Sequence, residues 1–159
     1  FKRLSDFMPV EFNFTERNRR PPRDGVNSLL SLTYAMLQSE LDFAIRRHGL
    51  DPMLGVLHTV VPGRPSLVLD MMEIFRPALA DHFVLELLSR RQITVADFES
   101  HEDDGVYLKQ ESRQKYFRLY ENMMLGSDRS GQWRKLIDRD VLSLKSQMAG
   151  ESGSFFRMK

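Results

Sequence analysis

The sequence of 159 residues contains no cysteine. Disulfides, thiolate zinc sites and thiol chemistry are therefore excluded for these residues, because each of them needs a cysteine sulfur. The absence of cysteine fits a protein of the reducing cytoplasm, and this is the localisation that we expect. The sequence also lacks an uninterrupted apolar stretch long enough to span a bilayer, so no membrane association is expected.

A strong net charge is also lacking, because 23 Lys and Arg residues face 22 Asp and Glu residues, leaving a formal charge of +1. A protein that wraps nucleic acid with its whole surface is usually more basic. Phosphate binding would therefore depend on local clusters. The densest is RNRRPPRDG at residues 17–25, with four arginines within seven residues. Its two prolines exclude a helix, and a solvated turn is the alternative to a binding loop.

The hydrophobic pattern predicts a mostly helical, all-α fold. The expected helices cover residues 26–48, 67–91, 109–125 and 132–148, and a small hairpin is expected at residues 98–108. Asp24 and Ser66 are suited to cap the first two helices at their N-termini. Gly49 is suited to end the first helix, and Pro77 to bend the second.

We expect three segments along the chain. Residues 1–16 are predicted to be the tail of an upstream helix stopped by Pro9, followed by an extended connector. Residues 17–149 form the expected helical domain. The Gly- and Ser-rich residues 150–159 are predicted to be a flexible tail.

Asp70 and Glu73 are three residues apart in the second expected helix, so both carboxylates leave the same face. Two acids on a largely apolar helix are costly to bury without a cation, and a divalent metal is one way to neutralise them. The linker before this helix ends in His58. One imidazole with carboxylate oxygens suits Mg²⁺ or Mn²⁺ better than zinc. The alternatives are a helix-dipole partner for Asp70, an ion pair of Glu73 with Arg76, and an ordinary loop histidine.

Three blocks of the sequence resemble the motifs of one protein family. They are RNRRPPRDGVNSLLS at residues 17–31, GLDPMLGVLH at residues 49–58 and SLVLDMMEIFRP at residues 66–77. The blocks are similar to those of the CRISPR-associated endonuclease that integrates new spacers, and they occur in the family's order. With the helices that follow, the resemblance covers nearly the whole chain.

The resemblance implies a metal-dependent DNA endonuclease/integrase that inserts spacers into a CRISPR array by phosphoryl transfer. It implies that His58 and Glu73 bind Mg²⁺ or Mn²⁺, and that Asp70 supports or shares this catalytic metal site. The DNA-binding residues that it implies are Arg17, Arg19, Arg20, Arg23, Asn27 and Arg76. A further glutamate ligand is expected just before residue 1, which would make this chain the C-terminal helical portion of the protein.

The resemblance also implies partners. These are double-stranded DNA as prespacer and CRISPR repeat, a small ferredoxin-like adaptation protein, and a second copy in a homodimer of the full-length protein. Two other functions stay open from the residues alone. One is a helical DNA-binding or assembly module without catalysis, and the other is an unrelated metal-dependent nuclease with an Asp-x-x-Glu helix.

The later helices contain basic and aromatic residues whose roles are open. The basic residues Lys109, Arg113, Lys115 and Arg118 recur near helical spacing. Because Glu111 and Glu121 dilute them, a solvated face is favoured over a binding stripe. The aromatic residues are Tyr107, Tyr116, Phe117, Tyr120 and Trp133. They are able to stack on nucleic-acid bases, but aromatic residues at this spacing are more often core.

Overall fold

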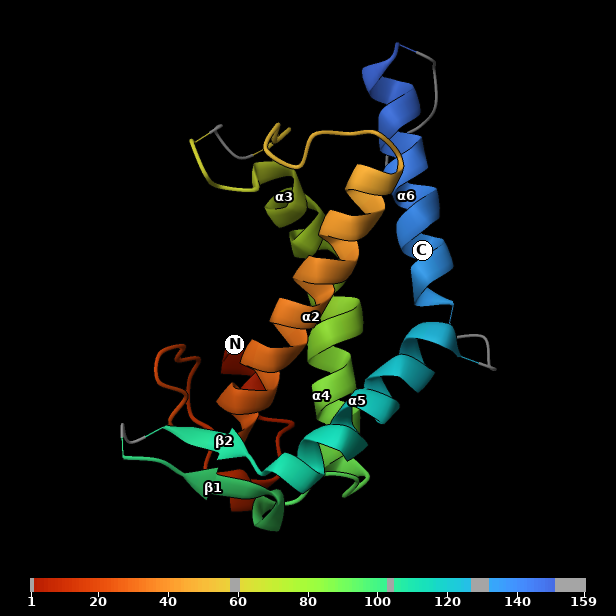
Figure 1. The fold of residues 1–159 in the computed structure, drawn as a ribbon. Coiled ribbons are helices and arrows are strands. Elements are labelled where there is room, and N and C mark those ends of the chain that lie inside the picture. Colours follow the sequence, from red (N-terminus) through yellow and green to blue (C-terminus); the bar gives the residue numbers. More distant parts are fainter. Residues whose placement is uncertain (1, 58–60, 103–104, 127–131, 151–159) are drawn as a thin grey trace.

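The computed structural model describes residues 2–57, 61–102, 105–126 and 132–150. Its helices are α1 (Lys2–Ser5), α2 (Gly25–Arg47), α3 (Ser66–Phe75), α4 (His82–Ser89), α5 (Gln110–Leu125) and α6 (Trp133–Met148). Strands β1 (Phe98–Ser100) and β2 (Val106–Leu108) pair antiparallel, with Phe98 opposite Leu108. The predicted helical fold and its hairpin are therefore confirmed (Figure 1).

Helix α2 is the central element and packs against α3, α4, α6 and β2. Its N-terminus is capped as predicted, because the Asp24 carboxylate accepts the backbone N–H of Asn27 at 2.8 Å. Gly49 follows the helix with a φ of +75°, a backbone conformation that favours glycine. None of the helices in the described ranges is long and apolar enough to cross a membrane.

The single helix predicted for residues 67–91 is wrong in its middle. A π-helix, η2 (Arg76–Asp81), separates α3 from α4, and α4 ends at Ser89. Pro77 explains the interruption, because its ring clashes with the carbonyl four residues earlier and it has no N–H to donate. The predicted cap is also wrong: Ser66 is the first helical residue, and Pro65 occupies the cap position without a side-chain hydrogen bond.

The N-terminal segment also differs from the prediction. Residues Val10–Phe12 form a 3₁₀ turn, η1, instead of an extended connector. The Phe12 ring meets the Phe98 ring edge-on, with 6.0 Å between the centroids. A Cβ atom at Gly25 would lie 3.0 Å from the Phe98 ring, so a larger residue there would have to displace this ring slightly.

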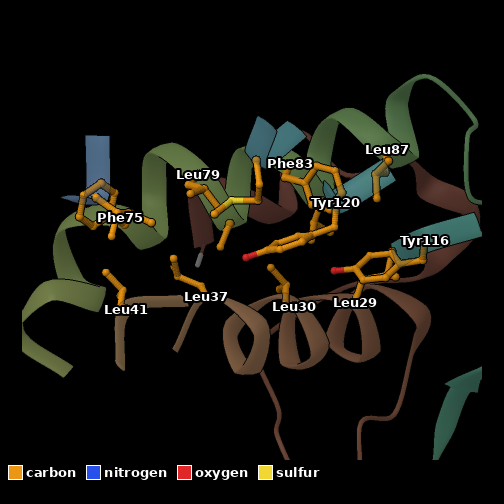
Figure 2. Close-up of a cluster of buried hydrophobic side chains, with 14 of the residues drawn as sticks. Leu29, Leu30, Leu37, Leu41, Phe75, Leu79, Phe83, Leu87, Tyr116 and Tyr120 are labelled. Atoms are coloured by element: carbon orange, nitrogen blue, oxygen red, sulfur yellow. The ribbon is translucent and has the colours of Figure 1, made fainter. Parts of the chain in front are cut away.

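The core lies between α2 and the α3–η2–α4 segment (Figure 2). The labelled buried residues are Leu29, Leu30, Leu37 and Leu41 on α2 and Phe75, Leu79, Phe83 and Leu87 on the opposite segment. Tyr116 and Tyr120 of α5 lie against the Phe83 ring, with centroid distances of 5.8 and 5.7 Å. These aromatic residues are therefore core, as the sequence favoured.

The two buried tyrosines differ in one hydrogen bond. The hydroxyl groups of Tyr116 and Thr33 are 2.6 Å apart, whereas the Tyr120 hydroxyl has no hydrogen-bond partner among the described residues. We expect Tyr116→Phe to lower the free energy of unfolding by about 1 kcal/mol and Tyr120→Phe to change it much less. Urea denaturation of both variants measures the difference. Equal losses of unfolding free energy in the two variants would contradict a stabilising hydrogen bond between Tyr116 and Thr33.

Candidate functional site

The arginine loop, residues 17–23, is held on α2 by a buried asparagine. Asn27 has no exposed surface. Its Oδ1 accepts from Nη1 of Arg17 at 2.8 Å and from the backbone N–H of Asn18 at 2.9 Å. Its Nδ2 donates to the Asp24 carboxylate at 2.6 Å. Asn27 therefore uses its polar atoms inside the protein, where they set the path of the loop.

The ring of Tyr34 on α2 contacts two of the arginines that were predicted to bind DNA. The guanidinium carbons of Arg17 and Arg76 lie 5.5 and 5.9 Å from the centroid of its ring, within range of a cation–π contact. Arg17 also donates from Nη2 to the Ser31 hydroxyl at 2.8 Å. The Tyr34 hydroxyl donates to the Asp81 carboxylate at the end of η2. The Tyr34 ring thus lies against both arginines, and Asp81 orients this ring through its hydroxyl group.

Burial shifts the pKa values of Tyr34 and of the charged groups around it. It raises the pKa of Tyr34, and the hydrogen bond to Asp81 raises it further, so the phenol stays a neutral donor. Burial also raises the pKa of Asp81, against the hydrogen bond from Tyr34 and the charge of Arg76. Burial lowers the pKa of Arg17. An arginine remains charged at neutral pH after such a shift, so the cluster stays cationic.

The arginine loop, α2 and α3 enclose a pocket of about 300 Å³, which we call the Glu73 pocket. Four arginines and one acid line it: Arg17, Arg19, Arg20, Arg76 and Glu73. The Glu73 side chain is 53% exposed, and its Oε2 lies 3.1 Å from Nη2 of Arg76. The structure therefore brings five of the predicted site residues together at this pocket, whereas Arg23, Asn27 and Asp70 do not line it. The predicted alternative, a Glu73–Arg76 ion pair, is present as well.

Asp70 makes different contacts from Glu73, although both lie on α3. It is only 4% exposed. Its Oδ2 accepts the backbone N–H groups of Val56 and Leu57 at 2.6 and 2.9 Å. These residues directly precede His58, the predicted metal ligand, which lies outside the described residues. Asp70 therefore anchors the linker that leads to position 58.

Within the described ranges, no three or more His, Cys, Asp or Glu side chains gather in a way that could hold a metal. Glu73 still suits the role of a single ligand, because its exposed carboxylate borders a cationic pocket that would attract phosphates. A carboxylate oxygen is the ligand type that Mg²⁺ and Mn²⁺ prefer. Among the described residues, Glu73 thus suits one position in a metal site whose other ligands lie elsewhere.

Residues 1–122 match the protein family described as CRISPR associated protein Cas1. The chain belongs to the Cas1 family. One Cas1 relative, the CRISPR-associated endonuclease Cas1 3 of Thermus thermophilus, is 48% identical over 124 residues. The matched part is 78% of this chain and 37% of that protein, so the chain spans less than two fifths of this relative's length.

Solved structures extend the Cas1 likeness beyond residue 122. A Cas1 protein from Thermotoga maritima has a TM-score of 0.87 and 28% identity, over 99% of this chain and 50% of that one. A casposase bound to integration product has a TM-score of 0.82 and 26% identity, over 97% and 45%. A Cas6-RT-Cas1–Cas2 complex gives 0.81 and 26%, over 99% and 18%. The family resemblance seen in the three sequence blocks is confirmed.

Two residues of the site were not predicted. Tyr34 has the helical spacing of a core residue in α2, so the sequence does not mark it as part of a site. Asp81 lies five residues after Arg76, and residues five apart do not share a face of an α-helix. The i→i+5 pattern of the π-helix changes that relation, and only Pro77 signalled it in the sequence.

Proposed function

We propose that this chain forms the helical catalytic part of a metal-dependent DNA endonuclease/integrase, which joins new spacers to a CRISPR array by phosphoryl transfer. Membership of the Cas1 family supports the reaction class. The observation that carries the proposal is the exposed Glu73 carboxylate in a pocket lined by four arginines. Such a pocket offers a ligand for a divalent cation beside donors for phosphate oxygens.

In this proposal Glu73 and His58 hold Mg²⁺ or Mn²⁺, together with the glutamate that the family resemblance places before residue 1. When bound, the metal polarises the scissile phosphate and stabilises the charge on the leaving 3′ oxygen. The Asp70 carboxylate positions the linker that ends at His58, through the amides of Val56 and Leu57. Ligands held in this way lose less entropy when the site assembles.

The arginines bind and orient the DNA backbone. Arg19 and Arg20 are exposed and form no hydrogen bond or ion pair with other described residues, so their guanidinium groups are available for phosphates. Arg17 and Arg76 are held by Tyr34 at the same pocket. Arg23 adds charge at the far end of the loop, and Asn27 acts indirectly by holding the loop. Contacts of this kind are salt-sensitive and tolerate any sequence.

The partners in this proposal follow the similar structures, one of which contains Cas1 with Cas2 and another an integration product. Double-stranded DNA would enter as prespacer and as CRISPR repeat. A small ferredoxin-like protein would bridge two homodimers of the full-length protein, in a prokaryotic cytoplasm. The alternative is a helical DNA-binding or assembly module without catalysis. The arginine-lined pocket supports that alternative as well, because its phosphate contacts need no metal.

Strand joining by the full-length protein separates the two functions. A labelled duplex with free 3′-OH ends is incubated with a plasmid that carries a CRISPR repeat. We expect labelled plasmid with Mn²⁺ or Mg²⁺ and only background with EDTA, because the phosphoryl transfer needs the cation. DNA binding, measured in parallel, should persist in EDTA. Binding without product under every metal condition would favour the non-catalytic module.

A further inference from the structure

Asp81 is an acid beside the arginine cluster, but it does not line the Glu73 pocket. It is the last residue of η2, which packs against α2 as well as against α3 and α4. Residues five apart do not share a face of an α-helix, whereas the i→i+5 hydrogen bonds of a π-helix bring them onto one side. Asp81 and Arg76 are five apart, and both contact the Tyr34 side chain. The π-helix therefore directs an acid and an arginine to the same tyrosine.

The Tyr34 side chain is held at both ends. Its backbone belongs to α2, and its hydroxyl group donates to the Asp81 carboxylate. Only two rotatable bonds lie between the backbone and the ring, so a hydrogen bond at the far end restrains both of them. A hydrogen bond to a carboxylate is also stronger than one between neutral groups. Removing this carboxylate would therefore release the ring from its orientation.

Two guanidinium groups lie against this ring, those of Arg17 and Arg76. Arg17 is also held by α2, because it donates to Oδ1 of Asn27 and to the hydroxyl group of Ser31, each at 2.8 Å. Arg76 pairs with Glu73, which is a metal ligand in the proposed site. A ring that moves would therefore displace Arg76 more than Arg17.

We propose that Asp81 is a positioning residue for strand joining: it fixes the Tyr34 ring, and the ring holds the Arg76 guanidinium where a DNA phosphate binds. Asp81 touches neither the DNA nor the metal in this arrangement, because it does not line the Glu73 pocket. The inference rests on the proposed strand-joining function. It adds Tyr34 and Asp81 to the residues on which that reaction depends.

Single-turnover strand joining by the full-length protein with Mn²⁺ tests this role. We expect Asp81→Ala to slow joining by about tenfold, because a misplaced group near the reacting atoms slows a reaction. Loss of an acid beside arginines would by itself favour phosphate binding, so a slower reaction points to the displaced arginine. Tyr34→Phe loses only the hydroxyl group and should be as slow as Asp81→Ala. Asp81→Asn keeps an oxygen acceptor for that hydroxyl and should retain most of the rate.

A double variant separates positioning from a general loss of stability. If Asp81 acts through Arg76, adding Asp81→Ala to Arg76→Ala should slow joining no further. Independent effects of the two substitutions would multiply instead. The rates of the wild-type protein, both single variants and the double variant complete this cycle.

The salt dependence of KM for the DNA is a second readout, measured in steady state with Mn²⁺. Each phosphate contact contributes about 0.9 to the slope of log KM against log salt concentration. Asp81→Ala and Arg76→Ala should both make this slope shallower by about 0.9, since each loses the same contact. A variant that is only less stable keeps its phosphate contacts and the wild-type slope.

Two control variants alter similar contacts outside the Glu73 pocket. Tyr116→Phe removes the hydroxyl group of another tyrosine that forms a hydrogen bond with α2. Asp138→Ala removes another acid that pairs with an arginine, Arg47. Neither Tyr116 nor Asp138 lines the Glu73 pocket, so both variants should join strands at the wild-type rate.

The outcomes distinguish this inference from the proposed function. If Asp81→Ala joins strands as fast as Asp138→Ala, or if its loss multiplies with that of Arg76→Ala, the inference is overturned while the proposed function stands. An unchanged salt slope in Asp81→Ala also overturns it. If the wild-type protein joins no strands, the proposed function fails and the inference fails with it.

Discussion

Replacing Glu73 with alanine is expected to lower metal-dependent strand joining by more than about 100-fold, because loss of residues that merely support metal ligands already costs about 10–100-fold. Glu73 is the acid of the arginine-lined pocket and is the described residue best suited to bind the cation. Glu73→Gln should fail almost as completely, since an amide oxygen carries no charge to offset the metal. The rate of strand joining and calorimetric titration with Mn²⁺ measure both effects.

The ion pair between Glu73 and Arg76 needs its own control. Glu86 on α4 and Arg90, which directly follows this helix, form a similar pair 2.9 Å apart, and neither residue lines the pocket. Such exposed pairs contribute about 0.5 kcal/mol or less to stability. Glu86→Ala should therefore leave joining and Mn²⁺ binding unchanged. If Glu73→Ala behaves like Glu86→Ala, Glu73 holds no metal and the proposed function loses its central ligand.

The Glu73–Arg76 pair also bears on DNA binding. The two groups are 3.1 Å apart, and Glu73 cannot give the same oxygen fully to both arginine and metal. Metal binding at Glu73 would weaken the pair and free Arg76 for a phosphate oxygen. The cation–π contact with Tyr34 would keep the guanidinium at the pocket during this exchange.

The fold was largely predictable because its helices carry strong local signals. Asp24 caps α2 and Gly49 follows it, as the residue types require. The region around Pro77 was less predictable. A proline signals that an α-helix is disturbed, but the surrounding packing decides between a bend and a π-helix. The cap of α3 failed for a similar reason, since Pro65 and not Ser66 holds the position before the first turn.

The sequence predicted which residues belong to the site better than it predicted the contacts that those residues make. The arginine loop and Glu73 converge, which the family resemblance implied. Exposure along a helix was harder to predict, because Phe117 and Tyr116 are neighbours of similar hydrophobicity with opposite burial. Asn27 shows the converse: a polar residue in a binding motif is fully buried, and hydrogen bonds within the loop account for it.

Replacing Asp70 with alanine is expected to weaken Mn²⁺ binding by about 10–100-fold, although Glu73 stays intact. The carboxylate accepts the backbone N–H groups of Val56 and Leu57, and its loss removes the hydrogen bonds that hold the end of the linker before His58. Removing this charged acceptor should also lower the free energy of unfolding by about 2 kcal/mol. Calorimetric Mn²⁺ titration measures the first effect, and faster hydrogen exchange at the two amides identifies its cause.

Two further variants decide whether Asp70 acts through the linker. Asp70→Asn keeps an oxygen acceptor, so its Mn²⁺ affinity should lie between those of the wild-type protein and Asp70→Ala. Asp51 accepts the Met53 N–H at 2.9 Å on the same linker but is exposed, and Asp51→Ala should change neither Mn²⁺ affinity nor exchange at residues 56 and 57. If Asp70→Ala weakens Mn²⁺ binding while those amides stay protected, the carboxylate acts on the metal itself. If the Mn²⁺ affinity of Asp70→Ala is unchanged, Asp70 has only a structural role, because the loss of a residue that positions a metal ligand must change metal binding.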